Sequence, residues 1–141
     1  MPTHTVSVSI PTPAETVWST LADFADVSWI PLAGDVRVEG SGPGMQRFIG
    51  GSGSTPVVET LTALEPDRRT ISYDVANNPL GCERFHVTAT VAGDVDTTAT
   101  FVVDFSATAD DEKAVADVEA IYSMIAGWLA DHCAPAGARD A

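Results

Sequence analysis

Several polar side chains that could do chemistry fall on faces of the chain that are otherwise apolar. Successive side chains of a strand point to opposite sides, so Glu59 shares a face with Leu61, and Tyr73 lies on the apolar face of the next predicted strand. Tyr122 falls on the apolar stripe of a predicted helix. A carboxylate in such surroundings has to be paired, hydrated or neutralised, and if unpaired it can serve as a general acid or base. We therefore take Glu59, Arg47 and Tyr73 as the candidate catalytic residues.

Arg47 is the candidate partner of Glu59, but its direction is open. The segment M-Q-R-F-I at 45–49 has apolar residues at both spacings, so either its odd-numbered or its even-numbered positions face inward. Two roles follow for Glu59. It forms a structural ion pair with Arg47 across adjacent strands, or, held by Arg47 or by cavity water, it accepts a hydrogen bond from a ligand.

The other inward-facing residues are apolar or aromatic and suit a hydrophobic ligand. The candidate ligand-binding residues are Trp29, Glu59, Leu61, Tyr73, Phe85, Val87, Phe101, Tyr122, Ile125 and Leu129. A structural alternative is open for several of them. Both tyrosines could be ordinary core aromatics, and Trp29 could simply close the end of a helix. Trp128 is expected in the core or in helix packing.

The predicted elements follow the order strand, two helices, about six strands, helix. An alternating strand at 3–10 precedes a helix that starts at T-P-A-E, 12–15, and runs to about Phe24. D-V-S-W-I-P at 26–31 is a short second helix or a turn. Residues 111–133 form the last helix, because their apolar residues recur every three or four positions. Turn residues separate the six intervening strands, at 35–39, 45–49, 56–64, 69–76, 84–92 and 96–106.

This order predicts an α+β fold, in which a curved antiparallel sheet of about seven strands surrounds a long C-terminal helix, with two short helices after the first strand. We expect a single ligand-binding domain over 1–133 and a flexible tail at 134–141. One helix can cover such a sheet but cannot fill its concavity. We therefore expect a cavity that opens at the glycine-rich loops 50–54 and 77–81.

Composition limits the partners. The 141 residues include 20 acidic and 7 basic ones, and the formal net charge of −13 disfavours nucleic acid and anionic membrane surfaces. No apolar run approaches the roughly 20 residues of a membrane span, and the first residues lack a signal-peptide pattern, so we expect no membrane insertion and a cytoplasmic location. The cysteines and histidines lack metal-site spacing, and we expect no metal and no cofactor. The expected partner is a small hydrophobic molecule, and the chain is expected to be a monomer or a weak homodimer.

A family resemblance is carried by five stretches of the chain: V-S-I-P-T-P-A-E-T-V-W at 8–18, D-V-S-W-I-P at 26–31, G-P-G-M-Q-R at 42–47, V-E-T-L-T-A-L-E-P-D-R-R-T-I-S-Y at 58–73, and the final helix. Over about residues 4–132 the chain resembles the helix-grip (SRPBCC) superfamily of START domains, the birch-pollen allergen, plant abscisic-acid receptors and bacterial polyketide cyclases. The resemblance implies a shared cavity and not a shared reaction.

The resemblance also implies roles for three residues. A pocket-facing glutamate of the abscisic-acid receptors, on the strand before a P-D-R-R-like turn, is matched by Glu59, and Tyr73 and Phe85 match pocket aromatics on the next two strands. The receptors' S-G-L-P gate is absent here, so we do not expect their docking to a phosphatase.

Two functions stay open at this point. The first is a carrier, sensor or sequestering protein for a polyketide, lipid or phenolic metabolite. The second is a cofactor-independent polyketide cyclase or dehydratase that uses acid-base residues in the same cavity. The small number of inward-facing groups that can move protons favours binding.

Overall fold

The computed structural model describes residues 3–30, 36–50, 56–77, 82, 84–106 and 111–133. Within these residues the strands are β1 (Thr3–Ile10), β2 (Val36–Glu39), β3 (Gln46–Ile49), β4 (Val57–Glu65), β5 (Thr70–Ala76), β6 (Arg84–Gly93) and β7 (Thr97–Ser106), and the α-helices are α1 (Ala14–Ala22) and α2 (Asp111–Cys133). The strands form one sheet in the order β1-β7-β6-β5-β4-β3-β2. All neighbouring strands are antiparallel, as the sequence predicts.

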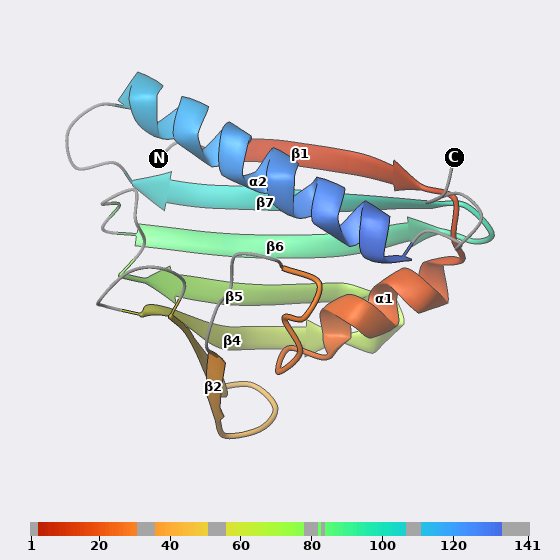
Figure 1. Cartoon of the computed structure of the whole chain (residues 1–141), viewed down its shortest axis with the longest axis horizontal. Coiled ribbons are helices and arrows are strands. Elements are labelled where there is room, and N and C mark those ends of the chain that lie inside the picture. The colour runs from red at the N-terminus through yellow and green to blue at the C-terminus, as the bar shows by residue number, and fades with distance from the viewer. Residues whose placement is uncertain are drawn as a thin grey trace.

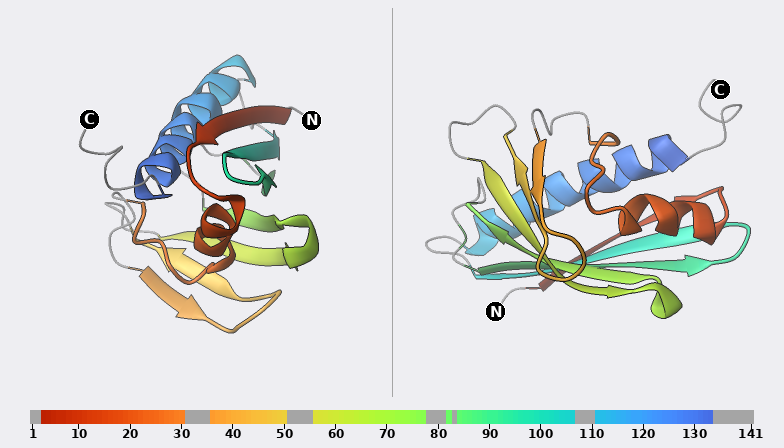
Figure 2. Two further views of the ribbon diagram at one scale, coloured as in Figure 1. Left: turned by 90° about the vertical axis from the view of Figure 1, so that its right-hand side faces the viewer. Right: turned by 90° about the horizontal axis from the view of Figure 1, so that it is seen from below.

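Both helices lie on the same side of the sheet (Figure 1). The long α2 crosses β1 and β7, and α1 packs against β6, β7 and α2. Figure 2 shows the sheet curling, so that β2 and β3 rise on the side where α2 lies. The predicted α+β helix-grip architecture is confirmed.

The strand alternation that predicts the fold also builds its core. In β6 and β7 every odd-numbered position except Gly93 is buried, and no even-numbered position is. The aromatic rings of Phe85, Phe101, Phe105 and Tyr122 meet beneath α2, with centroids 5.9–6.3 Å apart. Such tilted and offset ring pairs are favourable beyond the apolar area that they bury. This part of the concave side is therefore packed.

The segment after α1 forms turns, so the second of the two expected short helices is absent and the alternative of a turn is correct. The carboxylate of Asp26 accepts a hydrogen bond from the backbone N–H of Ser28 at 2.8 Å. Hydrogen bonds from the Ser28 hydroxyl and N–H lower the pKa of Asp26. Asp and Ser side chains favour turns over helices because they offer the backbone such local partners.

A bulge in β4 accompanies the bend of the sheet. The pairing of β4 with β5 shifts register between Leu61 and Ala63. On its other edge, Leu61 exchanges backbone hydrogen bonds with the stretch before β3, donating to the Met45 carbonyl at 2.9 Å and accepting from the Gly44 N–H at 2.7 Å. A β-bulge bends its strand and increases the local twist. It comes two residues after Glu59 and helps to turn β3 and β4 towards α2.

The two loops at which we expect the cavity to open fall mostly outside the described residues, at 51–55 and 78–81, and so does the expected tail at 134–141. The opening and the division into a domain and a tail therefore stay predictions. No helix among the described residues is both long and apolar enough to cross a membrane.

Candidate functional site

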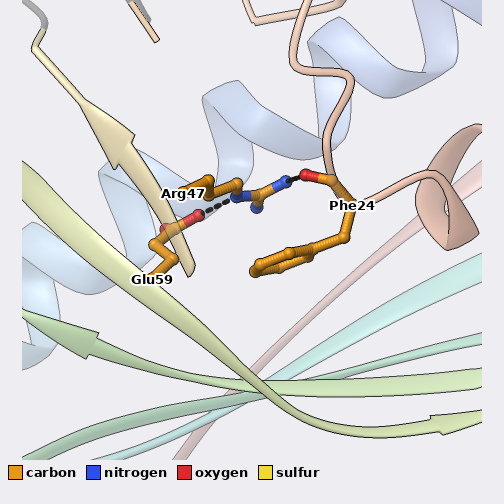
Figure 3. Close-up of polar contacts among 3 residues, drawn as sticks. All are labelled: Phe24, Arg47 and Glu59. Atoms are coloured by element: carbon orange, nitrogen blue, oxygen red, sulfur yellow. Dashed lines mark hydrogen bonds and ion pairs between the residues drawn. The ribbon is translucent and has the colours of Figure 1, made fainter. Parts of the chain in front are cut away.

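Arg47 and Glu59 form a buried ion pair at the bend of the sheet. They face each other directly across β3 and β4, and Arg47 Nε donates to Glu59 Oε1 at 2.6 Å (Figure 3). Arg47 is 5% exposed and Glu59 9%. Of the two alternatives for the segment 45–49, the structure shows the one in which Arg47 points inward, and Met45 is buried as well.

Arg47 also contacts the turn segment that follows α1, residues 23–30. Its Nη1 donates to the carbonyl oxygen of Phe24 at 2.9 Å (Figure 3). The guanidinium carbon lies 3.9 Å from the centre of the Phe24 ring and 5.3 Å from that of Tyr73, and the two rings are themselves 5.6 Å apart. A cation over an aromatic face is attracted by the ring quadrupole. Arg47 thus joins β3, β4 and the turn segment.

Phe24 is a residue whose role the sequence does not reveal. Its spacing from the apolar residues of α1 marks it only as a core residue. The atom that Arg47 contacts is a backbone carbonyl 23 residues away in sequence. Every residue type has such a carbonyl, so no local sequence signal could identify this contact.

The ion pair leaves hydrogen-bonding capacity unused. Within the part of the chain that the structure describes, Glu59 Oε2 and the second terminal nitrogen of Arg47, Nη2, have no hydrogen-bond partner. No fully buried side-chain nitrogen or oxygen of the described residues lacks a partner. The two atoms must therefore reach accessible space, where they offer one acceptor and one donor.

The two tyrosines connect the ion pair to α2. Burial, then the charge of Glu59, raise the pKa of Tyr73. Burial, then the neighbouring Tyr73 and Glu59, raise the pKa of Tyr122. Both phenols thus stay protonated at neutral pH, where they can donate a hydrogen bond.

The other predicted ligand-binding residues differ in how far they are enclosed. Leu61, Val87, Phe101 and Leu129 are at most 1% exposed, and Trp29 and Phe85 are 6% exposed. Ile125 is only half-buried. All belong to or pack against one apolar cluster. Their contact with a ligand stays a prediction.

One side of α2 carries half-buried apolar residues next to the fully buried row. Ile121, Ile125 and Trp128 lie four and three residues apart on this side. All three pack against the apolar cluster, so the expected place of Trp128 in the core or in helix packing is confirmed.

Two surface hollows among the described residues lie away from the ion pair. One is formed by Ser9–Pro11 and Asp96–Thr98, and the other lies over the end of β5 and the start of β6. Neither is lined by Arg47 or Glu59. The space in front of the free atoms of the ion pair is the better candidate site, because burial and unused polar atoms coincide there.

Comparisons with known proteins identify the family and support the fold. The family model described as polyketide cyclase/dehydrase and lipid transport matches residues 1–133. No curated protein matches the chain.

Solved structures share the fold at low sequence identity. A protein from Nitrosospira multiformis is 23% identical with a TM-score of 0.81, covering 98% of this chain and 99% of its own. An aromatase/cyclase from a Streptomyces species is 17% identical with a TM-score of 0.73, covering 94% of this chain and 93% of its own. Norcoclaurine synthase from Thalictrum flavum, in complex with dopamine and hydroxybenzaldehyde, is 14% identical with a TM-score of 0.68, covering 92% of this chain and 84% of its own.

Proposed function

Since the chain belongs to the polyketide cyclase/dehydrase and lipid transport family, we propose that it binds a small, mainly hydrophobic molecule between α2 and the concave side of the sheet, and that the Arg47–Glu59 pair contacts a polar group of that molecule. The molecule is a polyketide, a lipid or a phenolic metabolite, and the protein carries, senses or sequesters it. It acts in the cytoplasm as a monomer or a weak homodimer.

The observation that supports this proposal most is the buried ion pair with two unused polar atoms. Apolar walls with a few placed polar groups are the usual form of a small-molecule site. Phe24 and Tyr73 supply aromatic surface beside the pair, and Trp29 and Ile125 belong to or pack against the apolar cluster that includes both rings. The neighbour solved with dopamine and hydroxybenzaldehyde supports a phenolic ligand, since both of its ligands are aromatic.

The proposal is tested by thermal unfolding in the presence of aromatic polyketides, simple phenols, fatty alcohols and fatty acids. A ligand that binds only the folded state raises the melting temperature in a concentration-dependent way. At least one class is expected to do so, and Glu59→Gln is expected to weaken the binding of an uncharged ligand about tenfold, which is the loss of one hydrogen bond to a charged group. Glu39→Gln, at an exposed carboxylate, is the matched control and should leave binding unchanged. No effect of any class on the melting temperature contradicts the proposal.

A second candidate is a cofactor-independent cyclase or dehydratase, supported by the closeness of a carboxylate to two protonated phenols. In such a step, Glu59 removes a proton from a carbon next to a ketone, and that carbon forms a bond to a second carbonyl carbon. The carbonyl oxygen then takes a proton from Tyr73, and subsequent loss of water gives the dehydrated ring.

Binding is the stronger candidate because Arg47 occupies one of the two Glu59 oxygens, which leaves a single oxygen for proton transfer. Incubation with a linear poly-ketone and detection of a cyclised product test the enzyme. Product formation that Glu59→Gln abolishes while affinity survives would favour the enzyme over the carrier.

A further inference from the structure

We propose that Glu59 determines the charge of the ligand: the site accepts an uncharged molecule with a hydroxyl or carbonyl group and excludes carboxylates. This inference rests on the proposed function, because it concerns the ligand of the same site.

The first step is the charge balance inside the protein. Among the described residues, Arg47 and Glu59 are the only buried charged side chains. Arg37 and Arg68 are exposed and pair with Glu39 and Glu65. A ligand that enters the apolar interior therefore meets one positive and one negative charge, already paired at 2.6 Å.

The second step is the use of each polar atom. Two nitrogens of Arg47 are occupied, Nε by Glu59 and Nη1 by the Phe24 carbonyl. A carboxylate ligand at the remaining Nη2 would lie close to the Glu59 carboxylate that Arg47 already binds, and two like charges out of water repel strongly. Its own charge would be desolvated, and the described residues supply no second buried cation to offset the cost.

The third step is the match to an uncharged group. A hydroxyl can donate to Glu59 Oε2 or accept from Arg47 Nη2, and a carbonyl oxygen can accept from Nη2. The ligand class is therefore neutral alcohols, phenols and ketones. Fatty acids and other carboxylates are excluded.

The test compares two probe pairs that differ only in the polar group, decanol with decanoate and 2-naphthol with 2-naphthoate, by isothermal titration calorimetry at neutral pH. The wild-type protein is expected to bind the uncharged member of a pair at least about tenfold more tightly, equivalent to about 1.4 kcal/mol. In Glu59→Gln the freed charge of Arg47 is expected to raise carboxylate affinity by a similar factor. Glu59→Asp keeps the charge and should keep the preference for uncharged probes.

Glu39→Gln removes the same formal charge from the surface, so it separates the effect of Glu59 from the general repulsion by a chain of net charge −13. Wild-type protein that binds the carboxylate as tightly as its uncharged partner overturns the inference and leaves the proposed function standing. Unchanged carboxylate affinity in a folded Glu59→Gln also overturns it. If Glu59→Gln does not fold, the ratio of the wild-type affinities for the uncharged and the charged probe decides the test. Failure of all four probes to bind overturns the proposed function and the inference with it.

Discussion

Arg47 and Glu59 are directly opposite each other across β3 and β4, with 2.6 Å between Nε and Oε1, and both side chains are buried. The pair lies where the turn segment after α1 meets the sheet, because Arg47 also binds the Phe24 carbonyl. One contact therefore joins three parts of the chain and places a donor and an acceptor at the candidate site.

Removing one partner of this ion pair should lower the free energy of unfolding substantially. Arg47→Met leaves the Glu59 carboxylate buried without its partner and is expected to lower the free energy of unfolding by about 3–5 kcal/mol. The double variant Arg47→Met/Glu59→Met removes both charges and should recover most of that loss. Urea denaturation of both variants measures the difference. Arg37→Met, at an exposed pair, is the control and should stay within about 0.5 kcal/mol of wild type. A loss as small as that control in Arg47→Met would contradict a buried pair.

The tyrosines should resist ionisation until the protein unfolds. The chain contains only two tyrosines, and both have a raised pKa in the folded state. An unfolded chain ionises them near pH 10, so their contribution to stability is fully present below about pH 10 and is lost as the pH rises above it. Near-ultraviolet absorbance of tyrosinate should therefore stay flat through about pH 10 in the native protein. In guanidinium, which unfolds the chain, the tyrosinate absorbance should rise near pH 10. Native titration of either phenol near its ordinary pKa would show that its hydroxyl reaches water.

The core beneath α2 should behave as a packed one at Leu129. This side chain is 0% exposed, so Leu129→Ala is expected to cost about 2–5 kcal/mol through lost burial and a residual cavity. Met124→Ala, at a residue of the same helix that is 47% exposed, should change stability by no more than about 0.5 kcal/mol. Thermal or urea unfolding gives both values. A small cost at Leu129 would mean that open space already adjoins it.

Two glycines should respond to alanine in opposite directions. Gly93 has a φ of +118°, and a Cβ there would collide with the Asp96 carbonyl oxygen, so Gly93→Ala should lower the stability by more than about 1 kcal/mol. Gly127 lies within α2, and nothing is within 4 Å of the position of its added Cβ. Gly127→Ala should therefore raise stability by about 0.5–1 kcal/mol. The same unfolding experiment compares them, and equal effects of the two changes would contradict this hairpin geometry.

Much of the fold could be predicted because periodicity is a local property. The alternation of β6 and β7 and the apolar repeat of α2 appear in the residues themselves, and so does the inward position of Glu59 and Tyr73, which are both buried. Residues 26–31 fit the sequence patterns of both a short helix and a turn, and the hydrogen bond between Asp26 and Ser28 favours the turn.

The direction of the Arg47 side chain could be determined only from the tertiary structure. β3 has only four residues, too few for alternation to indicate one face, and Arg47 turns inward because Glu59 and the Phe24 carbonyl offer partners there. Sequence alone determined the element order, the sheet's inward faces and the acidic surface, all of which follow from neighbours along the chain. Only the tertiary structure determined that Arg47 pairs with Glu59 and with the Phe24 carbonyl. Strand register and chain reversal bring these three residues together, and their spacing in the sequence does not indicate the contacts.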